Sequence, residues 1–319
     1  MASVSKLGLL FCLVFVTLEA FQAVYLGSVF QNTDSFLVGA GVFGISVFAC
    51  TLITALFRAA ELAASVRSWK IVSALNVFAA TTWCTYFLAI QLIEPAIVFT
   101  IFSGMVPLGT VIAAWCGLPE ARTLRRRADI VGNLLILLAL LFLGAVTVSG
   151  HSGFVRGGWL TGFAGVALSV ASGLCTAFVI LLSARLNRKG VGPLAQFGLR
   201  FILYTAIALG AYALGLDDKG IGIEPMELAT LILVGLGVIA LPLYLVQKAI
   251  PLLNPSIIAA MTALGPVMVF SMQVVERRVD YSAATLTGLV VYMAGALLAV
   301  YGSVLQSTHT RAGCSRTVS

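Results

Sequence analysis

Long runs of apolar residues alternate with short polar connectors over almost the whole chain. A helix needs about 20 apolar residues to cross the hydrocarbon core of a bilayer, so each run of that length predicts one transmembrane helix. The chain contains ten such runs and no soluble domain between them. The predicted helices cover residues 7–29, 35–57, 70–91, 95–116, 129–148, 157–184, 193–216, 227–247, 251–275 and 282–305.

The third and fourth predicted helices share a pattern with the eighth and ninth. One stretch reads "YFLAIQLIEPAIVFTIFSGMVPLGTVIAAWCGLPE" and the other reads "YLVQKAIPLLNPSIIAAMTALGPVMVFSMQVVE". Each has a tyrosine, a proline at a helix start, a second proline eleven or twelve residues later and a final glutamate. The matching pairs are Tyr86 and Tyr244, Pro95 and Pro255, Pro107 and Pro266, and Glu120 and Glu276.

These pairs are 156 to 160 residues apart, about half the chain, so each half contains five predicted helices. Because five is odd, the second half enters the membrane in the opposite orientation. We therefore predict an all-α membrane protein with ten transmembrane helices in two inverted-topology five-helix repeats. The first repeat covers residues 1–150, the second covers 151–306, and 307–319 form a loose cytoplasmic tail. This architecture is typical of transporters.

The second proline of each pair lies inside a predicted helix. Pro107 and Pro266 each remove a backbone hydrogen bond, which predicts a kink near the middle of the membrane. A single kink of this kind is explained by packing alone. Two kinks at matching positions favour a central cavity between the repeats, because carbonyl groups freed at that depth need protein or water around them.

Composition excludes a soluble protein. The chain is 60% hydrophobic and 10% charged, with a mean hydropathy of +1.07. Its net charge is +7, but the basic residues gather in short connectors, which indicates membrane topology rather than nucleic-acid binding. With a cytoplasmic N-terminus, fourteen basic residues lie on the inside and only Arg156, Lys219, Arg277 and Arg278 on the outside. Both termini are therefore predicted to be cytoplasmic. The alternative, a signal peptide cleaved after Ala23, would remove the first helix of the repeat.

The sequence contains no cluster typical of an enzyme. Its six cysteines form no CxxC pair, and the two histidines lie outside the apolar runs. We expect no metal, no cofactor and no catalytic residues. A phosphate-binding GxxxxGK[ST] motif is also absent, so ATP does not drive the protein directly.

With these repeats, the sequence resembles the drug/metabolite transporter superfamily, of the EamA type. The continuations "ADIVGNLLILLALLFLG" and "SAATLTGLVVYMAGALLAVYG" extend the resemblance over most of both halves. It implies a substrate site among helices 1, 3, 4, 6, 8 and 9, with helices 5 and 10 peripheral. Pro119 and Val275 stand where family members commonly have a glycine. The resemblance does not identify a cargo.

Glu19 is the leading candidate for chemistry, because it lies about 18 Å along the first helix, near the membrane midplane. A charge there costs roughly 2.5–3.5 kcal/mol, so the side chain must face protein or water. Gln22, Cys12 and Phe15 continue the same helix face. Glu19 can carry a proton or hold a substrate ammonium, or it can be a neutral structural group.

Further candidates each have a structural alternative. Arg200 either binds a carboxylate or snorkels to the headgroups. Ser172 and Thr176 form either a pocket wall or a contact between helices. The remaining predicted cavity residues are Trp83, Tyr86, Ser103, Tyr244 and Thr262; for the first two an aromatic belt at the membrane surface competes, and for Ser103 and Thr262 a bond to a carbonyl beside the kink.

The tenth predicted helix has Gly288, Gly295 and Gly302 at seven-residue spacing. Such a ridge allows another helix to approach closely. The partner is either the fifth helix or the same helix of a second copy in a homodimer.

We therefore expect a secondary transporter in a bacterial inner membrane, working by alternating access. It would export a small polar or amino-acid-like metabolite, driven by the proton gradient or the solute gradient. Its partners are then a small-molecule solute and the lipid bilayer. The alternatives are an importer of the same solutes and a membrane sensor or assembly partner that transports nothing.

Overall fold

The computed structural model describes residues 6–118, 121, 127–220, 222–249, 252–253, 258, 261–277 and 279–316, and excludes the side chains of residues 244, 247, 248 and 303–316. Within these residues all regular secondary structure is helical, apart from one isolated bridge between Ile93 and Val155. Nine helical stretches of this part are long and apolar enough to cross a membrane. The class predicted from sequence, an all-α membrane protein, is confirmed.

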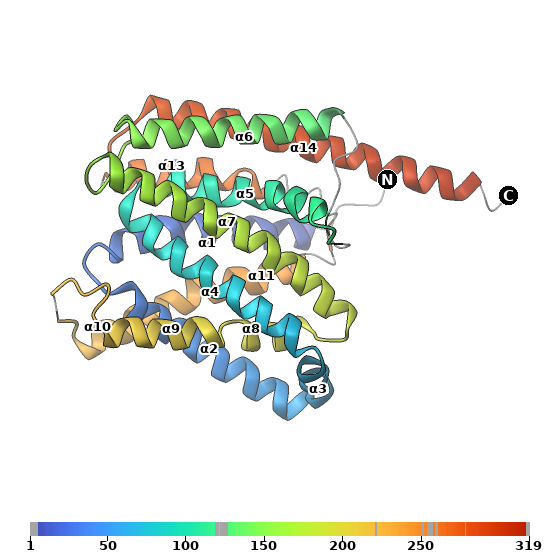
Figure 1. Ribbon diagram of the computed structural model, residues 1–319, viewed down its shortest axis with the longest axis horizontal. Coiled ribbons are helices and arrows are strands. Elements are labelled where there is room, and N and C mark those ends of the chain that lie inside the picture. Colours follow the sequence, from blue (N-terminus) through green and yellow to red (C-terminus); the bar gives the residue numbers. More distant parts are fainter. Residues whose placement is uncertain are drawn as a thin grey trace.

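The helices follow the chain as a bundle (Figure 1). Their bounds are α1 Lys6–Val29, α2 Ser35–Phe57, α3 Ala59–Arg67, α4 Trp69–Leu92, α5 Pro95–Trp115, α6 Arg127–Val148, α7 Trp159–Arg188, α8 Pro193–Arg200, α9 Ile202–Ala213, α10 Pro225–Gly235, a π-helical segment Leu236–Ala240, α11 Leu241–Ala249, α13 Gly265–Glu276 and α14 Ala283–Arg316. Local signals account for several starts. Asp34 caps α2 by accepting from the backbone N–H groups of Phe36 and Leu37. Proline occupies one of the first two positions of α5, α8, α10 and α13, where its missing N–H costs nothing.

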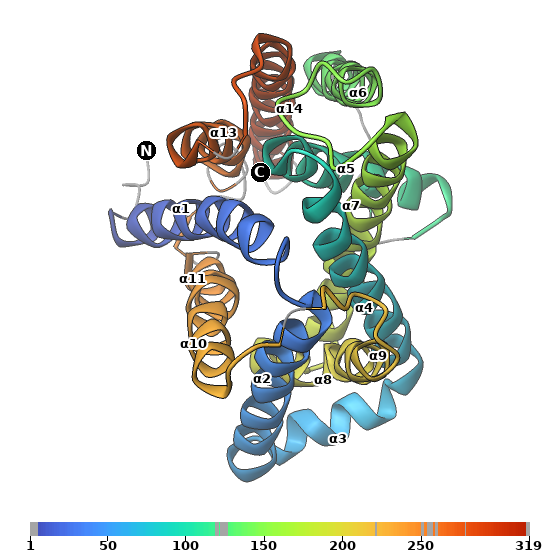
Figure 2. The ribbon, with the colours of Figure 1, turned by 90° about the vertical axis from the view of Figure 1, so that its left-hand side faces the viewer.

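The bundle has two distinct ends. The connectors 30–34, 93–94, 149–158, 214–220 with 222–224, and 277 with 279–282 lie at one end, which we call the Glu94 end (Figure 1). The start of α1, the end of α14 and the short helix α3 lie towards the opposite end. In the end-on view, α1, α13, α14 and α6 lie on one side and α2, α8, α9 and α10 on the other (Figure 2).

The structure differs from the sequence prediction in several places. Within the predicted helix 251–275 the described residues include the 12-residue α13 and, separated from it by a turn at 263–264, helical residues 258, 261 and 262, so no continuous tenth span is described there. Pro266 does not kink a continuous helix, because α13 begins only at Gly265 and the proline lies in its first turn. The predicted tail is helical as far as Arg316, since extending an existing helix is far easier than starting one. Pro107, in contrast, lies inside α5 as predicted.

The glycine ridge of α14 packs against α6 of the same chain. A Cβ added to Gly295 would lie 2.9 Å from the backbone nitrogen of Ile136, and one on Gly302 would lie 2.6 Å from that of Asp129. From the other side, a Cβ on Gly132 would lie 2.4 Å from the nitrogen of Ala299. The two backbones therefore approach too closely to admit a side chain between them. Of the two partners predicted for the ridge, the structure thus shows the one inside the same chain.

The seventh predicted helix is interrupted by a side chain of α4. The helix breaks at Phe201, between α8 and α9. Asn76 donates from Nδ2 to the carbonyl of Leu199 at 2.8 Å and accepts from the N–H of Leu203 at 3.1 Å. These two backbone groups would bond to each other in a continuous helix. A side-chain amide that inserts between the backbone hydrogen-bonding groups of a helix is a known cause of a bend. The sequence has no proline at this break from which it could be predicted.

The α6–α14 contact predicts a large effect from a small substitution. Gly132→Ala should lower stability by about 1–3 kcal/mol, because the added methyl group meets backbone that has no side chain to move aside. Gly144→Ala on the same helix is the matched control, since its Cβ would meet only Val166 at an ordinary 3.5 Å. Thermal unfolding in detergent should show a lower midpoint for Gly132→Ala alone; equal midpoints would contradict the close packing.

The bridging amide predicts that Asn76→Leu destabilises the protein although its volume hardly changes. Removing the amide leaves the Leu199 carbonyl and the Leu203 N–H without these partners, at about 1–3 kcal/mol. Thr81→Val, which removes an exposed hydroxyl of α4 bonded to its own helix, should have little effect. The unfolding midpoints of the two variants decide between a bridging and an incidental role for Asn76.

Candidate functional site

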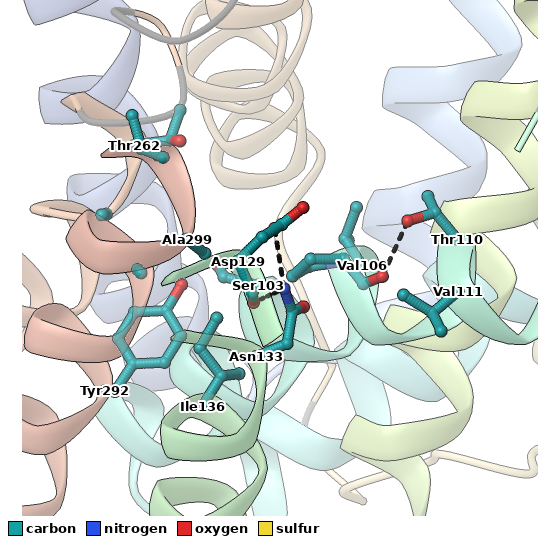
Figure 3. Close-up of a pocket in the computed structure, with 14 residues that line it drawn as sticks. Ser103, Val106, Thr110, Val111, Asp129, Asn133, Ile136, Thr262, Tyr292 and Ala299 are labelled. Atoms are coloured by element: carbon teal, nitrogen blue, oxygen red, sulfur yellow. Dashed lines mark hydrogen bonds between the residues drawn. The ribbon is translucent and has the colours of Figure 1, made fainter. Parts of the chain in front are cut away.

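A cavity of about 290 Å³ lies between α5, α6, α14 and the residues just before α13. It occupies the half of the bundle away from Glu94, next to the proline inside α5. Figure 3 shows residues of both sequence halves facing one another across it. Its lining consists of Ser103, Val106, Pro107, Thr110, Val111, Asp129, Asn133, Ile136, Thr262, Ala263, Tyr292, Ala296, Ala299 and Val300.

Hydrogen-bond acceptors are prominent in this cavity. Asn133 donates from Nδ2 to the backbone oxygen of Asp129 at 2.8 Å and to its carboxylate at 3.3 Å, and its own Oδ1 has no protein partner. Pro107 supplies no N–H to the carbonyl of Ser103, and the Thr110 hydroxyl donates to the Pro107 carbonyl at 2.7 Å. Both Asp129 and Asn133 are buried. A lining of this kind suits a ligand that brings hydrogen-bond donors.

Three residues predicted from the repeat lie in this one cavity. Ser103 and Pro107 come from the first half, and Thr262 comes from the matching place in the second. Sequence reasoning missed Asp129, Asn133 and Tyr292. The signal for the first two was present, as polar residues one helical turn apart in an apolar run. It was passed over because helices 5 and 10 were expected to be peripheral, whereas α6 and α14 supply much of the lining.

Glu19 lies outside this cavity, in the middle of α1. Its predicted stripe faces protein, since Cys12, Phe15 and Gln22 are all buried. Glu19 itself is half-buried, and its carboxyl is close enough to Cys12 and Tyr86 to interact with both electrostatically. The stripe therefore faces the protein rather than lipid, and Cys12 packs with Ala249 of α11 and with Leu253.

The predicted aromatic residues belong to a cluster in the bundle interior. Tyr86 is buried and packs against Phe102, with ring centroids 5.3 Å apart. Trp83 packs against Phe43 at 4.9 Å and Phe87 at 5.3 Å. Neither ring lies in a surface belt. Tyr244 lies in α11, and its side chain is outside the described part.

The remaining predicted residues make contacts within the bundle. Ser172 of α7 donates to the carbonyl of Thr82 at 3.0 Å, and the hydroxyl of Thr176 lies 3.3 Å from that of Thr82, so both join α7 to α4. Arg200 packs its guanidinium over the rings of Phe197 and Phe201, at 4.9 and 4.6 Å from their centroids. It therefore lies among aromatic rings beside the break between α8 and α9.

A buried carboxyl at the Glu94 end was not foreseen from the sequence. Glu94 has no exposed surface and accepts from the N–H of Gly153 at 2.9 Å, the hydroxyl of Thr285 at 2.9 Å and the side-chain amide of Gln273. Gln273 in turn accepts from the N–H of Ala96 at 3.1 Å. Burial raises the pKa of the Glu94 carboxyl, and these hydrogen bonds oppose the rise.

A second polar cluster lies at the same end. Lys219 donates to Asp217 and, at 2.8 Å, to Oε1 of Gln91. Asp217 also accepts from the N–H and the hydroxyl of Ser35, at 2.9 and 2.7 Å. The cluster joins the α9–α10 connector to α2 and α4. The described residues contain no group of three or more His, Cys, Asp or Glu that could hold a metal ion.

Comparison with known proteins identifies the fold but no family. No protein-family model matches the chain, and no curated protein matches its sequence. A solved structure, described only as a crystal structure of a protein, matches it with a TM-score of 0.61 and 20% identity, over 93% of this chain and 96% of the other. Most of the helical arrangement is therefore a fold that an experimentally determined protein also adopts.

Proposed function

We propose that the protein is a secondary transporter that moves a small polar solute across a membrane by alternating access, as the drug/metabolite transporter resemblance implies. The observation that carries the proposal is the acceptor-rich cavity at Pro107, which residues of both sequence halves line within an apolar bundle. Polar space at membrane depth is expensive and marks a solute pathway in membrane proteins.

The lining also favours a class of solute. The Asp129 carboxylate and the Asn133 side-chain oxygen are acceptors, and the hydroxyls of Ser103 and Tyr292 can donate or accept. An amine or an amino-acid-like molecule matches this set. At about 290 Å³ the cavity is near the lower limit of the range usual for ligand pockets, so the solute is small.

The distribution of charge supports an orientation with both termini in the cytoplasm, in a bacterial inner membrane. The Glu94 end carries Arg156, Lys219 and Arg277 among its described basic residues. The opposite end carries more of them: Lys6, Arg58, Arg67, Lys70, Arg127, Arg185, Arg188 and Lys189. The positive-inside rule then makes the Glu94 end the outer one. The cavity therefore lies in the cytoplasmic half, where an exporter would collect its solute.

Glu19 is the proposed proton-binding group. Its stripe faces the bundle interior, and it interacts electrostatically with Tyr86 of α4. No salt bridge to Glu19 is found in the part of the chain that the structure describes. A carboxyl in this setting can exchange a proton as the surrounding helices move.

Filling the cavity should stop transport. Ala296→Phe places a ring in the lining, whereas Ala294→Phe places the same ring on the exposed face of α14. Purified variants in liposomes would be tested for uptake of radiolabelled small amines and amino acids. We expect background uptake for Ala296→Phe and near wild-type uptake for Ala294→Phe. Equal uptake by the two variants would exclude this cavity from the pathway.

Neutralising Glu19 should remove the dependence of transport on pH. In the same liposomes the wild-type rate should change with an imposed pH gradient, because proton release at Glu19 accompanies each cycle. Glu19→Gln keeps the shape but not the titrating group, so its rate should stay low and independent of pH. Glu227→Gln, at the surface of α10, is the control. Wild-type rates for Glu19→Gln at every pH would refute the proton role.

A further inference from the structure

Every side-chain bond that Glu94 makes in the described residues crosses between the sequence halves. Glu94 precedes α5 in the first half, whereas Gly153, Gln273 and Thr285 all belong to the second. Gln273 also returns a bond to the first half by accepting from Ala96. A single buried carboxyl thus holds the connector between the halves, α13 and α14 against the start of α5.

The same end has further ties across the halves. The backbone of Arg156 donates to the carbonyl of Leu92 at 2.9 Å, next to the bridge between Ile93 and Val155. The Asp217–Lys219 cluster adds a second side-chain link, to Gln91 of α4. Away from this end the described ties across the halves include Glu61, which accepts from the N–H of Gly192 at 3.0 Å, and Asn76, which bonds to Leu199 and Leu203. Among the described residues, Glu94 thus joins three partners of the second half at once, and its neighbours at this end add further ties across the halves.

Two of the helices held by Glu94, α5 and α14, also line the cavity, and the third, α13, begins just after it. Glu94 lies just before α5 and about 20 Å from Pro107 along the helix axis, at 1.5 Å per residue. Thr285 and Tyr292 are on α14, two helical turns apart, and Gln273 is on α13, which begins just after Thr262 and Ala263. The helix α5 contains Pro107 where it reaches the cavity, and the helical conformation is interrupted just before α13 begins at Gly265. A solute that moves these helices at the cavity therefore acts on the bonds to Glu94.

We propose that Glu94 is a latch. Its bonds to Gln273, Thr285 and Gly153 keep the Glu94 end closed while the cavity is accessible from the opposite end. When these bonds break, the Glu94 end opens and the opposite end closes. This inference rests on the proposed transport function and assigns the positioning residue that controls access. The Gly153 N–H and the Gln273 amide N–H both donate to the Glu94 side chain, so each of them needs an acceptor at position 94. Replacing one carboxyl oxygen by an NH₂ group sets donor against donor.

Thiol labelling tests the latch without any solute. In a variant whose native cysteines are replaced, Ile93→Cys reports on the Glu94 end, because Ile93 is fully buried there. Ser103→Cys, which differs by one atom, reports on the cavity. Each is labelled with a membrane-impermeant methanethiosulfonate in detergent, with and without Glu94→Gln. We expect Glu94→Gln to speed labelling at position 93 about tenfold or more and to slow it at position 103.

Two outcomes would overturn the latch. Unchanged labelling at position 93 would show that Glu94 does not hold this end closed. Faster labelling at 93 with no change at 103 would show local loosening rather than exchange of access. Glu61→Gln, at the opposite end, is the control and should not speed labelling at 93. If Glu94→Gln fails to fold, Thr285→Val removes one donor at nearly constant volume and should give the same pair of changes to a smaller extent. Transport can fail in liposomes while this result stands, so the two proposals are tested separately.

Discussion

The need to satisfy backbone hydrogen bonds without water governs this structure. Within a bilayer every N–H and C=O group must find a partner in the protein, which is why the described chain is almost wholly helical. The departures from regular helix are therefore the informative places. At the break between α8 and α9, the Asn76 amide replaces the lost backbone bond. At Pro107, the Thr110 hydroxyl binds a carbonyl and a cavity adjoins the helix.

The helices themselves were predictable from sequence because apolar length is a strong signal. The predicted span 35–57 coincides with α2, and most other bounds agree within a few residues. The break at Phe201 was not predictable, because its cause is a side chain more than a hundred residues away. The start of α13 was misjudged for a different reason. A proline in an apolar run permits either a kink or a helix start, and only tertiary packing decides between them.

The residues of the candidate site were likewise predictable from the sequence only in part. Ser103 and Thr262 were found because a repeat in the sequence marks corresponding positions in space. Asp129 was passed over because helices 5 and 10 were expected to be peripheral; its burial follows from the close approach of α6 to α14. The same packing places the three glycines of the α14 ridge against α6, so the ridge is covered within one chain.

The chemistry around Glu94 is consistent with a contact that must open and close. A buried ion pair would be costly to separate, since breaking it leaves two unpaired charges out of water. The described partners of Glu94 are instead neutral donors, an amide, a hydroxyl and a backbone N–H. Each of these can bond to water when the end opens, so separation leaves only one charge to hydrate, and water stabilises that charge. The Asp217–Lys219 pair at the same end differs, because both of its members belong to one connector and stay together when the halves move. In the proposed latch the charged pair thus stays within one connector, and neutral donors bridge the two sequence halves.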